Sequence, residues 1–176
     1  MKYLLVAAAT LALSAGAANA APQNFSFTGN FSGDSDVQLF NFTIGAVSDV
    51  TLRSYSYAGG TMADGTLISA GGFDPILALW DGSGSLVQEF DDGPEPVPSD
   101  PVTGSQFDTH LVLLNLAPGS YTASIAQYAN FAAGTNLSDG FSEASASFTA
   151  IYGCSAGQFC DVSADNRTSF WAFDVL

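Results

Sequence analysis

Hydrophobic and polar residues alternate with a period of two along most of the chain, and Gly, Asn, Asp and Pro interrupt this alternation at short intervals. Such alternation is typical of β-strands that bury one face, and no segment has the 3.6-residue period of an amphipathic helix. Eight or nine short strands in about 155 residues predict an all-β fold, a two-sheet antiparallel β-sandwich with a jelly-roll arrangement. The predicted strands are residues 24–31, 37–44, 50–57, 76–80, 86–90, 109–115, 120–128, 144–152 and 170–175.

Three insertions rich in Gly, Pro or polar residues separate these strands, at 59–72, 91–107 and 130–140. The segment 91–107 contains several prolines and acidic residues and little apolar content. We expect all three to be exposed loops, which is where binding residues commonly lie on a rigid sandwich.

The first 20 residues follow a different pattern. A short basic start at Lys2 precedes an apolar run over 4–13 that is too short to span a bilayer, and Ala18-Asn19-Ala20 forms an A-x-A cleavage site. These features predict a Sec-type signal peptide cleaved after Ala20. We therefore expect one β-sandwich domain, residues 21–176, that is secreted to the extracellular space or the periplasm. No later segment has 18 consecutive apolar residues, so we expect no membrane insertion.

The composition restricts the class of partner. Only 3 Lys and Arg residues stand against 17 Asp and Glu residues, which gives a formal net charge of −14. A chain this acidic cannot neutralise phosphate backbones, so we expect no nucleic-acid binding. Hydrophobic residues make up 47% of the chain and charged residues 11%, which indicates a globular domain rather than an acidic disordered tail.

The two cysteines, Cys154 and Cys160, lie close together in the sequence. Because the signal peptide implies an oxidising compartment, we expect a disulfide that closes a small surface loop. A zinc site would need further thiol or imidazole ligands, and His110 is the only histidine.

The segment 73–92, FDPILALWDGSGSLVQEFDD, is predicted to form a β-hairpin with an aspartate at each end. Asp74 and Asp91 lie equally far from a turn centred on Gly82 and Ser83, so the two carboxylates should face each other. Like charges directly opposite in a strand pair are destabilising, which predicts either a solvated rim or a bound cation. Asp81 belongs to the turn at the other end of the hairpin.

Calcium fits such an acidic cluster because it prefers six to eight oxygen ligands. Asp74, Asp91 and Asp92 supply carboxylates at one edge of the hairpin, and Asp34 and Asp36, which precede the second strand, are candidates to complete the same site. The chain has no EF-hand loop. Two readings stay open: a Ca²⁺ site, or solvated carboxylates at strand ends.

We expect no enzymatic activity. The G-x-S-x-G motif of serine hydrolases is absent, and His110 lies in an alternating strand, where a structural role is expected. Asp74 with Asp91 or Asp92 meets the carboxylate spacing of glycosidases only loosely.

Three segments resemble, in sequence and in order, the bacterial pre-peptidase C-terminal (PPC) domain. They are GDSDVQLFNFTI (33–44), FDPILALWDGSGSLVQEFDD (73–92) and LAPGSYTASI (116–125). The chain looks closest to stand-alone secreted relatives of the kind often found with PEP-CTERM tails. The resemblance implies a jelly-roll β-sandwich that accompanies extracellular enzymes without doing chemistry itself, and it does not give the binding target.

The expected function is a secreted, noncatalytic binding or adhesion module at the bacterial surface or matrix, with an extracellular polysaccharide or a surface protein as its partner. One alternative is a carbohydrate-binding module whose rings stack on sugars, with Tyr55, Tyr57, Tyr128 and Phe131 as candidates; the same rings could instead fill the core. The other alternative is a self-assembling extracellular subunit with a donor strand over 21–31.

Overall fold

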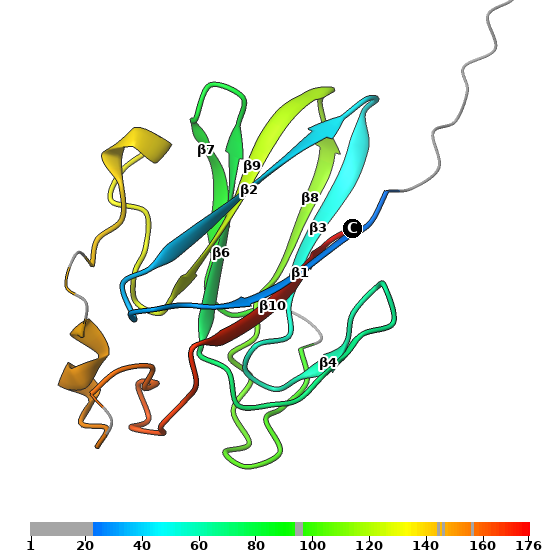
Figure 1. The fold of residues 1–176 in the computed structure, drawn as a ribbon. Coiled ribbons are helices and arrows are strands. Elements are labelled where there is room, and N and C mark those ends of the chain that lie inside the picture. Colours follow the sequence, from blue (N-terminus) through cyan, green and yellow to red (C-terminus); the bar gives the residue numbers. More distant parts are fainter. Residues whose placement is uncertain (1–22, 94–96, 144, 146, 156) are drawn as a thin grey trace, which may run out of the picture.

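The computed structural model describes residues 23–93, 97–143, 145, 147–155 and 157–176, and two four-stranded antiparallel sheets pack face to face in it (Figure 1). This architecture confirms the predicted all-β sandwich. The strands are β1 (Phe25–Asn30), β2 (Val37–Ile44), β3 (Ser48–Ser54), β4 (Gly60–Thr61), β5 (Leu67–Ile68), β6 (Pro75–Asp81), β7 (Leu86–Phe90), β8 (His110–Leu116), β9 (Gly119–Gln127) and β10 (Phe170–Val175).

The order of the strands is that of a jelly roll. One sheet has the order β1-β10-β3-β8 and the other β2-β9-β6-β7, while β4 and β5 form a small separate hairpin. Most connections between the eight long strands pass from one sheet to the other, and β1 at one end of the chain lies beside β10 at the other. This is the double Greek-key pattern that the sequence predicted.

The core lies between the two sheets and follows from the alternation of apolar residues. In β9 the inward side chains are Tyr121, Ala123 and Ile125, which join Leu77 and Leu79 of β6 in one hydrophobic cluster. Burying each of these large apolar side chains contributes about 1.5–3 kcal/mol relative to exposing it.

Strand β6 is buried on both of its faces, and only its last residue, Asp81, is half-exposed. On the outer face Trp80 contacts the ring of Phe141 at a centroid distance of 6.1 Å and donates its indole N–H to Ser124 Oγ at 3.0 Å. The insertion that contains Phe141 therefore covers the outer face of the second sheet.

Two local predictions are wrong. Phe148–Tyr152, expected as part of a strand over 144–152, forms a 3-10 helix (η2), in which the backbone N–H and hydroxyl of Thr149 donate to the Asp34 carboxylate. Residues 144 and 146 lie outside the described residues. The insertion 59–72, expected as a loop, contains the β4–β5 hairpin.

Cys154 and Cys160 form a disulfide with a Cα–Cα distance of 5.8 Å, as predicted. The predicted signal peptide, residues 1–20, lies outside the described residues. Among the residues that the structure does describe, no helix is long and apolar enough to cross a membrane.

Candidate functional site: a buried carboxylate cluster

The charged end of the β6–β7 hairpin is built by the register of its two strands. Leu77 lies opposite Phe90, and a bulge between Leu79 and Trp80 gives β7 one extra residue. Continuing the register by one residue places Asp91 opposite Ile76, on the same face as Asp74 but diagonal to it. The sequence predicted that the two aspartates face each other directly, and the structure places them diagonally on one face. One residue of this shift comes from the turn, which is centred on Ser83 because Asp81 pairs with Ser85, and the other comes from the bulge.

Asp74, Asp91 and Asp92 nevertheless form one cluster. One carboxylate oxygen from each residue lies within 4.8 Å of the other two. Asp74 is buried, with 3% of its surface exposed, Asp91 is half-buried and Asp92 is exposed. The cluster thus begins inside the protein and opens to solvent on the side of Asp92.

Two of these carboxylates lack hydrogen-bond partners. Oδ1 of Asp74 and Oδ1 of Asp91 are buried and accept no hydrogen bond from any described residue. A buried carboxylate without donors or a counter-charge is costly, and burial of an ion in protein costs several kcal/mol even after relaxation. The cluster therefore has unsatisfied oxygen ligands that point to a missing positive group.

Burial and mutual repulsion raise the pKa values of all three groups. Burial, followed by the charges of Asp91 and Asp92, raises the pKa of Asp74 well above its usual value. The same burial, with Asp92 and Glu89 nearby, raises the pKa of Asp91 to about 7. Burial and the Asp108 carboxylate raise the pKa of Asp92. In each case burial is the larger cause, and the neighbouring carboxylates add to it by disfavouring a further negative charge.

Strand β8 begins beside this cluster and fixes its backbone. The Thr109 hydroxyl, which is buried, lies within hydrogen-bonding distance of the main-chain oxygens of Pro75 and Asp91. The backbone N–H of Gly93 donates to the main-chain oxygen of Asp108 at 3.2 Å. The ends of β6 and β7 are thus tied to the start of β8, which limits the movement of the carboxylates.

The nearby arginine does not neutralise the cluster. Arg167 Nη2 forms a buried ion pair with Asp100 Oδ2 at 3.1 Å and also donates to the carbonyl oxygen of Tyr57. Its guanidinium lies 3.7 Å from the centroid of the Tyr57 ring, and the Tyr57 hydroxyl in turn donates to Asp161. These bonds join the loops around the charged end, and among the described residues none forms an ion pair with Asp74 or Asp91.

The cluster fits a hard divalent cation. Ligand oxygens about 2.4 Å from a common Ca²⁺ lie at most about 4.8 Å apart, and the three carboxylates are close enough together to meet this requirement. Carboxylates without thiol or imidazole ligands favour Ca²⁺ over Zn²⁺. A Ca²⁺ ion bound here would neutralise Asp74 and Asp91, and water on the open side of Asp92 could complete its coordination.

The other two predicted ligands lie elsewhere. Asp34 is fully buried, and its Oδ2 accepts the backbone N–H of Thr149 at 3.0 Å and the Thr149 hydroxyl at 2.6 Å. Asp36 Oδ2 accepts the backbone N–H groups of Ser32 and Gly33. Both residues fix the loop before β2, and the structure does not bring them to the carboxylate cluster.

The aromatic residues proposed as sugar platforms have other roles. Tyr55 and Tyr57 are buried, and the Tyr55 hydroxyl donates to Asp174 Oδ2 at 2.9 Å. Tyr128 and Phe131 are half-buried and pack edge to face at 5.7 Å. Of the two alternatives for Tyr55 and Tyr57, ligand stacking or core filling, the structure therefore supports core filling.

Sequence reasoning missed Asp108, which is fully buried near the cluster. Its carboxylate accepts hydrogen bonds from the Ser54 hydroxyl at 2.7 Å and from the backbone N–H groups of Tyr57 and Ala58. Asp108, like Asp74, comes directly before an alternating strand, and this position could have indicated that its carboxylate lies at the same end of the sandwich. Both oxygens of the Asp108 carboxylate accept hydrogen bonds, whereas no described residue donates to Asp74 Oδ1. Asp34 is intermediate, because Thr149 donates to its Oδ2 while its buried Oδ1 has no donor among the described residues.

The fold and the site define a jelly-roll β-sandwich with a buried carboxylate cluster at one end of its central hairpin. Comparison with models of known protein families found no family that matches the chain, and comparison with curated proteins found no match. The resemblance to the PPC domain accordingly stays a prediction.

Proposed function

We propose that the protein is a secreted, noncatalytic jelly-roll module that binds a polysaccharide or a surface protein at the bacterial surface or matrix, and that Ca²⁺ at Asp74, Asp91 and Asp92 stabilises it. The observation that carries the calcium proposal is the pair of buried carboxylate oxygens without partners, on Asp74 and Asp91. A cation is the group that removes both the repulsion and the missing bonds.

The burial of the cluster also supports a structural rather than a catalytic role. Asp74 is 3% exposed, so a glycosidic bond could not reach its carboxylate without rearrangement of the hairpin. A Ca²⁺ ion held between the ends of β6 and β7 would instead stiffen the segment that follows Asp92.

Secretion is supported by the disulfide between Cys154 and Cys160, because disulfides persist in oxidising compartments. Extracellular Ca²⁺ modules typically have a Kd of about 10⁻⁴–10⁻³ M, which suits a site with only three protein carboxylates. The donor-strand alternative is less well supported, because β1 pairs along its whole length with β10 of the same chain.

The test is thermal unfolding of residues 21–176 in chelator and with added Ca²⁺. At a free Ca²⁺ concentration about 100 times the Kd, binding should stabilise the fold by about 2.7 kcal/mol. For a domain of this size that raises the Tm by about 5–10 °C. An unchanged melting curve would remove the calcium proposal.

Two variants locate the effect. Asp74→Asn should abolish the Ca²⁺-dependent rise in Tm and leave the calcium-free protein at least as stable as the original, because it removes an unpaired buried charge. Asp64→Asn is the matched control, since Asp64 is an exposed residue of the β4–β5 hairpin whose Oδ1 accepts the Thr66 N–H. The control should keep the full calcium effect.

A further inference from the structure

A groove beside the β6–β7 turn is lined mainly by hydroxyl and amide side chains, together with the Asp81 carboxylate and the apolar Leu137, and we propose that it binds a neutral saccharide. This inference rests on the proposed function as a binding module and names the chemical class of its partner. The groove has a volume of about 490 Å³, within the ~300–1,000 Å³ of small-ligand sites. It lies at the opposite end of β6 from Asp74, roughly 23 Å away at ~3.3 Å per residue.

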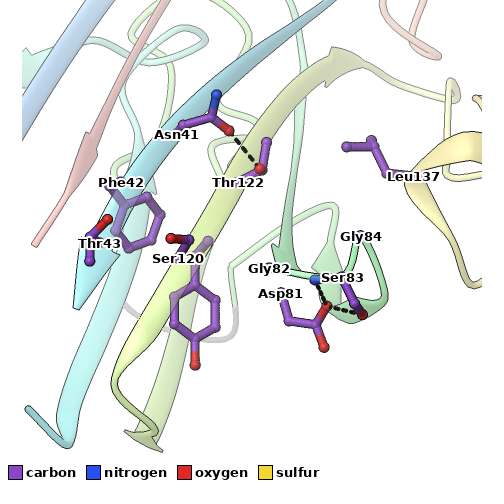
Figure 2. Close-up of a pocket in the computed structure, with 11 residues that line it drawn as sticks. Asn41, Phe42, Thr43, Asp81, Gly82, Ser83, Gly84, Ser120, Thr122 and Leu137 are labelled. Carbon is purple, nitrogen blue, oxygen red and sulfur yellow. Dashed lines mark hydrogen bonds between the residues drawn. The ribbon is translucent and has the colours of Figure 1, made fainter. Parts of the chain in front are cut away.

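The floor of the groove follows from the register of β2 and β9. Asn41 lies opposite Thr122, and Thr43 lies opposite Ser120, so these four side chains share one face of the second sheet. Figure 2 shows them along the two strands, with Thr122 Oγ1 bonded to Asn41 Oδ1 at 2.7 Å. Asn41, Thr43 and Ser120 are exposed, so their remaining donors and acceptors face solvent.

The β6–β7 turn forms the facing wall (Figure 2). Asp81 Oδ1 accepts the N–H and hydroxyl of Ser83, at 2.8 and 2.6 Å, and the N–H of Ser85 at 3.0 Å. Within the described part of the chain, Asp81 Oδ2 has no hydrogen bond, so it can accept a ligand hydroxyl. The Leu137 side chain lies beside Gly84 and adds an apolar edge.

The chemistry of the lining selects the ligand class. Hydroxyl and amide groups both donate and accept hydrogen bonds, as sugar hydroxyls do. None of the described residues that line the groove is Lys, Arg or His, so an anionic ligand would meet Asp81 without a counter-charge. The net charge of −14 adds to that repulsion. A neutral polyhydroxylated ligand fits these constraints.

Affinity electrophoresis of the calcium-saturated protein tests the inference, with a soluble glucan, mannan or galactan in the native gel and with polygalacturonate as the acidic comparison. We expect at least one neutral polysaccharide to retard the protein. The double variant Thr43→Val/Ser120→Ala removes two exposed hydroxyls and should weaken that retardation about tenfold. The control Thr51→Val/Ser69→Ala makes the same changes outside the groove and should behave as the original protein.

The saccharide inference is overturned if no neutral polysaccharide retards the protein, if polygalacturonate alone does, or if the groove variant binds as well as the control. The Ca²⁺-dependent rise in Tm is measured on the same proteins. A normal rise without retardation rejects the groove and leaves the calcium-stabilised module standing. Retardation that the groove variant weakens, without any rise in Tm, supports the groove and rejects the calcium site.

Discussion

The two ends of the β6–β7 hairpin use the same residue type in opposite ways. At the turn, Asp81 accepts three hydrogen bonds from residues two to four positions away, and these bonds lower the pKa of its carboxyl. At the other end, burial and neighbouring carboxylates raise the pKa of Asp74 and Asp91, and each has a buried oxygen without a donor. At the turn, neighbouring residues supply hydrogen bonds to the carboxylate. At the other end, no described residue supplies them to the buried Oδ1 atoms of Asp74 and Asp91.

The difference teaches where a ligand is needed. A turn aspartate supplies its own stability through local bonds, so its charge calls for no further partner. The aspartates at the strand ends are brought together by the sheet and shielded by distant segments, and no local bond compensates for their burial. The proposed Ca²⁺ ion would supply this end of the hairpin with the partners that Ser83 and Ser85 supply at the other.

The largest expected effect is a difference in the free energy of unfolding between two variants at the charged end. One removes a carboxylate that accepts hydrogen bonds, and the other removes a carboxylate with a buried oxygen that accepts none. Asp108→Ala leaves three donors without their acceptor, two of them backbone N–H groups, and should lower the free energy of unfolding by about 3 kcal/mol. Asp74→Ala in chelator should cost far less, because no donor loses a partner. Urea denaturation of both variants measures the two values, and equal losses would contradict the comparison. Asp108→Asn, which keeps one acceptor oxygen, should fall between Asp108→Ala and the original protein.

The next effect is a pH dependence confined to the charged end. Because the pKa of Asp91 rises from 3.8 to about 7 on folding, the native state keeps a proton that the unfolded state releases between those values. In the calcium-free protein, Asp91 should therefore cost no stability below about pH 4, and its cost should grow as the pH rises toward 7. We expect a loss of about 2 kcal/mol, roughly half of what the full shift implies, because Asp91 is only half-buried.

Chemical denaturation between pH 4.5 and 8 in chelator measures this slope, and Ca²⁺ should cancel it near pH 8. Asp91→Asn should flatten the profile. A calcium-free protein that gains stability over the same pH range would contradict the assignment, because it would mean that the folded state lowers the pKa values of these groups.

Much of the fold could be predicted because its cause is local. The period-two alternation in Tyr121, Ala123 and Ile125 gave the inward face of β9, and these side chains do lie in the core. A hairpin brings the start of its first strand beside the end of its second strand. The position of the turn therefore predicted that Asp74 would lie close to Asp91 and Asp92.

The remaining features depend on contacts far apart in sequence. The bulge between Leu79 and Trp80, which supplies one residue of the two-residue shift that makes the aspartates diagonal, has no sequence signature. Thr149 bonds Asp34 across 115 positions, and this bond accompanies a 3-10 helix at Phe148–Tyr152, where alternation predicted a strand. The sequence does not reveal this bond, so Asp34 was a plausible Ca²⁺ ligand there. In the fold the bond gives Asp34 a structural role.

The smallest expected effect is a fall in Tm when Asp81 in the β6–β7 turn is substituted. Asp81→Ala removes the acceptor of the Ser83 and Ser85 donors, which are near the surface and can bond to water instead. We therefore expect the Tm to fall by only about 3 °C, equally in chelator and in Ca²⁺. Asp81→Asn keeps an acceptor at Oδ1 and should recover most of that loss. A calcium-dependent loss at Asp81, measured by the same thermal unfolding, would mean that the two ends are coupled through β6 and would contradict the view that the turn is complete by itself.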